Sequence, residues 1–267
     1  MRNMRVLLCA LLGVSFAWIA AASAADLTLK APPQPPPTWA GPYVGGTLGY
    51  DWGTFDPRTA TTLNPLGEFS AVAIAAWNAL GIQSIKSSGF NGGLEAGYNW
   101  QQGAVVFGVE ADIESFRLRG TANTGPVAYP SGGGDTVTLI SNGSTNWLAT
   151  ARGRLGIASP GWLVYVTGGA AFTDLRGNFS FSDAAYGITE TASVSGTVTG
   201  YTVGGGIETK LSQQWSVKAE YLYVKFPSLS TSGILGVGLF APQAFQTFTH
   251  SIDLSANIVR VGLNYHF

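Results

Sequence analysis

The sequence predicts an all-β protein, an eight-stranded antiparallel transmembrane β-barrel with long external loops and short periplasmic turns. Three observations lead to this fold class. Charged residues make up only 11% of the 267 residues, so an ordinary water-covered surface is scarce. Segments of about ten residues alternate apolar side chains with polar, charged or glycine residues. The connections between these segments are alternately long and short.

Residues 1–24 have the pattern of a cleaved export signal. Arg2 and Arg5 precede an apolar run that ends in the small-residue triplet at 22–24, and no basic stop follows as it would in an uncleaved anchor. We therefore predict cleavage after residue 24 and a final location in the cell outer membrane. The single cysteine, Cys9, lies inside this signal, so the mature chain has neither a disulfide nor a thiolate site.

The mature chain divides into a short leader and one barrel domain. Residues 25–40 form a Pro-rich periplasmic segment, because APPQPPP at 31–37 favours extended polyproline backbone. Residues 41–267 form the barrel, and none of its apolar runs approaches the roughly 20 residues of a spanning helix. Without Arg2 and Arg5, 12 basic residues face 15 acidic ones, and this net charge of −3 argues against nucleic-acid binding.

The first four predicted strands each have one apolar face. They are residues 43–52 (Val44, Leu48, Tyr50, Trp52), 89–100 (Leu94, Ala96, Tyr98, Trp100), 104–116 (Val105, Phe107, Val109, Ala111, Ile113) and 146–157 (Trp147, Ala149, Ala151, Leu155, Ile157). The intervening positions carry glycine, polar or charged side chains, which is typical of a strand with one face in lipid and one in a polar interior.

The last four predicted strands follow the same rule. They are residues 162–173 (Trp162, Val164, Val166, Ala170, Phe172), 197–210 (Tyr201, Val203, Ile207), 215–226 (Val217, Ala219, Tyr221, Tyr223) and 251–267 (Val259, Val261, Leu263, Tyr265, Phe267). An even number of strands returns both ends of the barrel domain to the periplasmic side.

The connections decide between a barrel and a sandwich. The long ones are 53–88, 117–145, 174–196 and 227–250, and the short ones are 101–103, 158–161 and 211–214. Strict alternation places all long connections at one end, as in outer-membrane barrels, whereas a sandwich has no reason for it. Closure follows because an open sheet edge in lipid would leave backbone groups unpaired.

The charged side chains of the strands point to the opposite face from the apolar ones, and so into the barrel. We predict one lumen charge network, formed by Glu95, Glu110, Asp112, Glu114, Arg152, Arg154, Glu208, Lys218, Glu220 and Arg260. Because the third and fourth strands are neighbours, Glu110 or Glu114 can pair with Arg152 or Arg154. Eight strands leave an interior that side chains fill, which argues against a wide pore.

Aromatic residues are expected where the strands meet lipid headgroups. The predicted girdle is Trp52, Tyr98, Trp100, Trp147, Trp162, Trp215, Tyr265 and Phe267. The last strand ends in Val259, Val261, Leu263, Tyr265 and Phe267, which resembles the C-terminal signal that the barrel-assembly machinery reads. The assembly machinery is therefore an expected partner during insertion.

The sequence contains no convincing catalytic, cofactor or metal-binding set, and we predict that the protein is not an enzyme. His250 is followed directly by Ser251, so in a strand the two side chains lie on opposite faces and cannot form a nucleophile–base pair. His250 and His266 lie toward opposite rims and cannot share a metal ion. A haem site with His250 as its single ligand stays open as an alternative.

The first long connection contains an unusually apolar segment, AVAIAAWNALGI at 71–82. It predicts either a short helix that packs over the barrel mouth or a contact surface for another molecule. An external ligand bound through loop 54–87 is therefore an alternative reading.

Several stretches together resemble a known group. They are Ala25-Asp26-Leu27, WAGPYVGGTLGYDWG at 39–53, LVYVTGGAAF at 163–172, WSVKAEYLYVKF at 215–226 and VRVGLNYHF at 259–267. These are similar to small outer-membrane proteins of alphaproteobacteria, called outer-membrane immunogenic or opacity-like porin-family proteins.

The resemblance implies a barrel similar to the membrane domain of outer-membrane protein A, with a structural or surface-antigen role and with outer-membrane lipid and lipopolysaccharide around it. Porin, haem-binding and host-binding relatives imply the alternatives. These are a narrow gated porin for ions or very small solutes, and haem or host binding through the loops.

Deleting Phe267 tests the predicted assembly signal. Because the final aromatic residue ends the lipid-facing stripe that the machinery reads, we expect the truncated protein to reach the outer membrane at a much lower level. Surface abundance in cells is measured beside the unfolding midpoint of protein refolded in detergent, which should change little. Normal surface abundance of the truncated protein would contradict the role.

Overall fold

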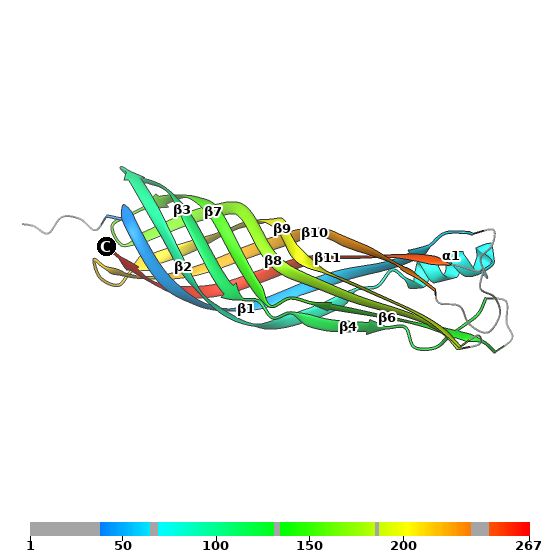
Figure 1. Cartoon of the computed structure of the whole chain (residues 1–267). Coiled ribbons are helices and arrows are strands. Elements are labelled where there is room, and N and C mark those ends of the chain that lie inside the picture. Colours follow the sequence, from blue (N-terminus) through cyan, green and yellow to red (C-terminus); the bar gives the residue numbers. More distant parts are fainter. Residues whose placement is uncertain (1–37, 65–68, 131–133, 185–186, 236–245) are drawn as a thin grey trace, which may run out of the picture. The chain divides into compact units, whose positions relative to one another are not determined.

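A computed structural model describes residues 38–64, 69–130, 134–184, 187–235 and 246–267 (Figure 1). The predicted signal at 1–24 and most of the Pro-rich segment lie outside the described residues.

The described residues form one helix and eleven strands. In chain order these are β1 (Gly41–Thr61), α1 (Ala71–Leu80), β2 (Ile85–Gln102), β3 (Val105–Ser115), β4 (Arg119–Asn123), β5 (Val127–Ala128), β6 (Thr136–Ser144), β7 (Trp147–Ala158), β8 (Trp162–Asp183), β9 (Ile188–Lys210), β10 (Trp215–Ile234) and β11 (Thr247–His266). In this part of the chain, no helix has both the length and the apolar character needed to cross a membrane.

Eight strands close into one antiparallel ring, which confirms the predicted fold class. Going around, the order is β1, β2, β3, β7, β8, β9, β10 and β11, and β11 pairs again with β1. The first and last strands are joined over almost their full length, from Tyr43↔His266 to Thr61↔Phe248. The ring therefore has no open edge where the strands cross the membrane, and its backbone groups are paired.

The outward face of the ring is apolar and has aromatic residues at two levels. Near the periplasmic end lie Trp100, Trp162, Trp215 and Phe267, and near the external limit lie Tyr50, Trp52, Phe90, Tyr201 and Tyr221, all exposed. On β2, Phe90 and Trp100 are ten residues apart, which is roughly 33 Å along a strand. At a tilt of about 40° this spans about 25 Å, the height of the apolar band of such barrels. Trp52 lies inside β1 rather than at its end.

The four long connections contain extensions of the strands as well as loop, and one of them also contains α1. β8 and β9 form a hairpin paired from Trp162↔Thr209 to Asp183↔Ile188. Outside the membrane, polar residues such as Asn178 and Ser180 replace the apolar outward residues, while inward positions such as Phe179 and Phe181 stay apolar. This alternation continues the strands far beyond the lipid (Figure 1).

Beyond the membrane, the ring rearranges into two four-stranded sheets. One contains β4, β6, β8 and β9, and the other contains β10, β11, β1 and β2. Among the described pairings, the β9–β10 ladder ends at Tyr201↔Lys225 and the β2–β3 ladder ends at Gly93↔Glu114. We call these two places, where neighbouring strands stop pairing, the seams of the extension. Across the seam beside β2, the Ser87 hydroxyl accepts from the backbone N–H of Arg119 and donates to its carbonyl, both at 2.9 Å.

Two apolar clusters fill the extension above the lumen charges. The inner cluster is Phe55, Ile85, Phe116, Leu118, Leu148, Ala171, Leu175, Phe179, Val198, Leu222, Val224, Phe226, Ile252, Leu254, Ala256 and Ile258. We call it the apolar plug. The outer cluster is Phe69, Ala73, Ile74, Trp77, Val137, Leu139, Phe181, Ile188, Leu235 and Phe248, and α1 supplies three of its members.

Helix α1 is the predicted apolar segment, and it packs against its own chain. The Ser70 hydroxyl caps its first turn by accepting from the N–H of Ala73 at 3.2 Å. The Asn78 side chain bonds both backbone groups of Thr61, at 2.8 and 3.0 Å, and so ties the helix to the end of β1. Trp77 is buried, with its ring 5.0 Å from that of Tyr129.

Replacing Trp77 with alanine tests whether α1 stabilises the extension. Trp77 is fully packed, so Trp77→Ala is expected to lower the free energy of unfolding of the outer cluster by about 3 kcal/mol. Val72 on the same helix is 67% exposed and supplies the control, since Val72→Ala removes no buried contact. Hydrogen exchange of β6 and β11 amides is the measurement, and equal protection in both variants would contradict this packing role.

Candidate functional site

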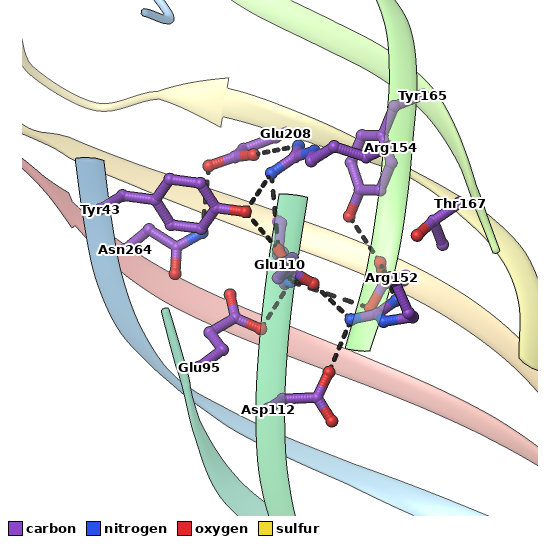
Figure 2. Close-up of polar contacts among 12 residues, drawn as sticks. Tyr43, Glu95, Glu110, Asp112, Arg152, Arg154, Tyr165, Thr167, Glu208 and Asn264 are labelled. Atoms are coloured by element: carbon purple, nitrogen blue, oxygen red, sulfur yellow. Dashed lines mark hydrogen bonds and ion pairs between the residues drawn. The ribbon is translucent and has the colours of Figure 1, made fainter. Parts of the chain in front are cut away.

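The ten predicted lumen residues all lie on inward-facing positions of the ring, and each is buried. They come from β2, β3, β7, β9, β10 and β11, and the structure brings them into a single hydrogen-bonded and ion-paired cluster. Figure 2 shows the part of it around Glu110, Arg152 and Arg154. Strand alternation explains this arrangement, because residues two apart on one strand share a face. Glu110, Asp112 and Glu114 thus stand in a column on β3.

Arg152 lies at the middle of the cluster. Its guanidinium group pairs with Glu110, with Asp112 at 2.7 Å and with Glu220 at 3.0 Å. Its Nε donates to the hydroxyl of Thr150 at 2.9 Å. Every nitrogen of the guanidinium therefore has a protein acceptor, which a buried arginine needs to offset lost hydration.

Arg260 and Lys218 connect the other carboxylates. Arg260 pairs with Glu220 at 2.7 Å, with Glu114 at 3.0 Å and with Asp112 at 3.2 Å. Lys218 lies 2.6 Å from Glu95 and 3.2 Å from Glu110. Because Glu110 and Glu220 each face more than one cation, the cluster is a network rather than a set of separate pairs.

Arg154 carries the network toward the periplasmic end. It pairs with Glu208 at 2.8 Å and donates to the Tyr43 hydroxyl at 2.8 Å. Its guanidinium carbon lies 4.0 Å from the centre of the Tyr165 ring, a cation–π contact. Glu208 also accepts from Asn264 at 3.1 Å.

Glycines make room for these long side chains. A Cβ atom on Gly49 would stand 2.7 Å from Cβ of Arg260, and one on Gly93 would stand 2.5 Å from Cβ of Glu114. Both distances are too short for carbon atoms, so a larger residue at either position would displace a charged neighbour. The glycines at inward positions of the strands thus leave the space that the charged side chains of the network occupy.

The network contains more acid than base. Its buried carboxylates in the described residues are Asp51, Glu95, Glu110, Asp112, Glu114, Glu208 and Glu220, and its buried cations are Arg152, Arg154, Lys218 and Arg260. Asp51 accepts a hydrogen bond from the Asn91 amide. The lumen is therefore polar and contains more acidic than basic side chains, and all of these side chains are buried.

Apolar layers border the network at both ends. On the periplasmic side, Trp39 is fully buried with Val106, Leu163 and Tyr165. Its indole N–H donates to the carbonyl of Ser159 at 3.0 Å. On the external side the apolar plug begins at Leu222 and Ile258, two residues from Glu220 and Arg260.

The structure places some predicted residues with other partners than expected. Glu110 contacts both Arg152 and Arg154, as the strand order suggests, whereas Glu114 pairs with Arg260. The contact between Glu114 of β3 and Arg260 of β11 crosses the lumen. The sequence alone does not show which residues of strands that are not neighbours will meet there.

Sequence reasoning missed several residues of the interior. Tyr43 was assigned to no face and Trp39 to the Pro-rich segment, yet both are buried against the network. Tyr43 stands at the start of the first strand, where an aromatic residue is also expected in the girdle, so the sequence does not show that it faces inward. Asp51 was the one detectable omission, because it alternates with Trp52 on the polar face.

His250 lies in the extension and not at a rim. Its Nδ1 is 2.9 Å from the Thr59 hydroxyl and its Nε2 is 3.2 Å from Glu190, while its ring stacks on Phe179 at 4.7 Å. Both ring nitrogens are thus engaged in this structure, and neither faces outward to bind iron. Ser251 lies on the other face of β11, as its position after His250 predicts.

The hydroxyl–imidazole–carboxylate chain of Thr59, His250 and Glu190 has the order of a catalytic relay, but it is packed between the two apolar clusters. A substrate would have to displace this core to reach Thr59. Among the described residues, no group of three or more His, Cys, Asp or Glu side chains is arranged to hold a metal ion.

The comparisons with known proteins agree with the closed ring and its lipid-facing band. A family model for the outer membrane protein beta-barrel domain matches residues 11–267. The chain belongs to this family. It is 30% identical over 254 residues to the 31 kDa outer-membrane immunogenic protein of Brucella melitensis, with 92% of this chain and 93% of the relative covered.

A second relative and a solved structure extend the comparison. The 22 kDa outer membrane protein of Rhizobium leguminosarum bv. viciae is 30% identical over 240 residues, covering 84% of this chain and 87% of the relative. The outer membrane protein OprG of Pseudomonas aeruginosa is 11% identical with a TM-score of 0.41, over 85% of this chain and 97% of OprG. Membership of the family places the chain in the outer membrane, and neither relative is named as an enzyme.

Replacing Arg260 tests the energetic role of the network. Arg260→Met leaves buried carboxylates without their cation, and we expect a loss of about 3–5 kcal/mol in the free energy of unfolding. Arg58→Met is the control, because this exposed arginine should change stability by about 0.5 kcal/mol or less. Urea unfolding in detergent micelles measures both, and equal midpoints for the two variants would contradict the network's role.

Proposed function

We propose that the protein is a closed structural barrel of the outer membrane that carries a rigid, antigenic extension on the cell surface. The observation that carries this proposal is the filled lumen, in which the charge network lies between Trp39 and the apolar plug. Solutes crossing the barrel would have to displace both layers.

The energetics of the network support a structural role. Conduction requires binding sites weak enough for an ion to leave, whereas the lumen cations are already held by several carboxylates each. Opening a path would separate buried ion pairs inside a low-dielectric barrel, which is costly. The network instead joins six strands and opposes their separation.

The extension supports a role at the surface. The β1–β11 and β8–β9 ladders continue from the membrane strands into the extension without a break, so backbone hydrogen bonds order its exposed face. Serine, threonine and asparagine dominate its outward positions, for example Asn178, Ser193 and Ser195. An ordered polar face of this kind suits an antigenic surface, in a family whose relatives carry the name immunogenic.

A narrow gated porin is the second candidate, and the excess of buried carboxylates over cations favours it. If the apolar plug moved, a negatively biased lumen would select small cations. The two proposals differ in whether the barrel conducts.

Planar bilayer recording separates them. We expect the refolded chain to insert without stepwise currents over a wide voltage range, because the plug and the network fill the lumen. Insertion is verified independently by protease protection of the same membranes. Discrete cation-selective steps that change in Glu110→Gln would contradict the structural proposal and establish the porin.

A further inference from the structure

The basic side chains outside the lumen are concentrated on the external side of the lipid-facing band. Among the described residues, all of them except Lys210 are exposed on that side, and they are Arg58, Lys86, Arg117, Arg119, Arg176 and Lys225. Lys86, Arg117 and Arg176 are each four residues beyond an outward apolar residue, Phe90, Ile113 and Phe172 respectively. Because an even spacing keeps the same face of a strand, Lys86 and Arg176 stand directly above the lipid, and Arg117 is exposed just beyond the end of β3 at Ser115.

Four of these cations gather on one side. We call Lys86, Arg117, Arg119 and Arg176 the cationic patch. Arg119 pairs in register with Ser144, and Ser144 pairs with Arg176, so the two arginines are two strand spacings apart, about 10 Å. The Ser87 bonds to the backbone of Arg119 bring Lys86 of β2 beside them.

The cationic patch is left with a positive charge. Arg176 pairs with Asp174 at 3.3 Å, while Arg119 donates to the amide oxygen of Asn146 at 3.2 Å. In the part of the chain that the structure describes, no carboxylate lies within ion-pairing distance of Lys86, Arg117 or Arg119. Asp174 also accepts from the backbone and side chain of Asn146, at 2.8 and 2.6 Å, and it offsets one of the four positive charges of the patch, so three remain (four cations less one carboxylate).

A polar hollow adjoins the patch. It has a volume of about 510 Å³ and is lined by Asp174, Arg176, Asn178 and the strand residues 193–197. The hydroxyl and amide groups of Asn178, Ser193 and Ser195 point outward here, beside the guanidinium of Arg176. Guanidinium groups bind phosphate through paired hydrogen bonds, and hydroxyl and amide groups suit sugar hydroxyls.

We propose that the cationic patch and its hollow bind the phosphorylated sugar headgroup of an outer-leaflet glycolipid. The phosphates lie on the arginines, the sugar occupies the hollow and the acyl chains run down the apolar face of β3, β7 and β8. The position of the patch identifies the source as membrane lipid, because a free surface polysaccharide would be met first at the α1 end of the extension. This site is independent of whether the lumen conducts.

Two exposed cations on other strands, β1 and β10, offer a control. Arg58 and Lys225 are also exposed cations outside the membrane, but Asp56 and Asp253 face each other there in register. Burial, and then the charge of Asp56, raises the pKa of Asp253, while Lys225 and Arg58 act to lower it. With two carboxylates beside its two cations, this face has no net formal charge, and it should attract phosphate less than the cationic patch does.

The experiment compares Arg119→Gln/Arg176→Gln with Arg58→Gln/Lys225→Gln in the full mature chain. The probe is vesicles of phosphatidylcholine containing bisphosphorylated lipid A, and unchanged heat-dependent gel migration verifies that each variant is folded. We expect the patch variant to bind about thirty-fold more weakly, or about 1 kcal/mol for each removed charge, and the control variant within about twofold of wild type. The difference should shrink as salt rises.

Two further arms identify the ligand chemistry. Vesicles with dephosphorylated lipid A should bind wild type as weakly as the patch variant binds the phosphorylated lipid. Phosphate-free core oligosaccharide should not compete. Equal loss in both double variants, no loss in the patch variant, or full competition by the free oligosaccharide would overturn the proposal.

Discussion

The constraint on which the whole structure depends is the pairing of backbone N–H and C=O groups in lipid. A spanning sheet has no water to satisfy an edge, so β1 must meet β11 and the sheet must close. Closure separates an outside from an inside, and the alternation of strands then sorts the side chains. Apolar residues such as Leu94 and Val261 go to lipid, and their neighbours Glu95 and Arg260 go to the lumen.

An eight-stranded ring has too little room for water around so many charges, and the charges therefore have to satisfy one another. Each cation of the lumen binds more than one acceptor, and glycines at positions such as Gly49 leave the volume that the arginines occupy. Buried ion pairs of this kind add little net stability compared with apolar packing, but removing one member is costly. The network therefore specifies one arrangement of the strands, while the apolar plug and α1 supply hydrophobic burial outside the membrane.

How much of this arrangement a sequence can reveal depends on the range of the interactions. The membrane parts of all eight strands and their facing directions follow from period-two alternation, which is local, and so does the inward placement of the ten network residues. The partners within the network do not, because Glu114 and Arg260 are far apart in sequence and meet across the lumen. The external strands were missed because their outward faces carry serine and threonine, which are as typical of loops as of solvated strands. Trp39 was missed because the prolines before it dominate the local pattern.

The two seams of the extension show that these strands pair into a closed ring only where they cross the lipid, although the same strands continue side by side beyond it. The β9–β10 ladder ends at Tyr201↔Lys225, next to the outer aromatic level, and beyond it the two strands are held by side chains instead. Leu229 packs over Gly196, and Glu190 covers Gly233. Pro227 and a register shift between Phe226 and Leu229 come directly after the last β9 pair of β10, but the shift lies in the ladder with β11, which continues to Ile234↔Thr247. Where water can satisfy an edge, the chain abandons the ladder, and a single closed sheet becomes two sheets packed around an apolar core.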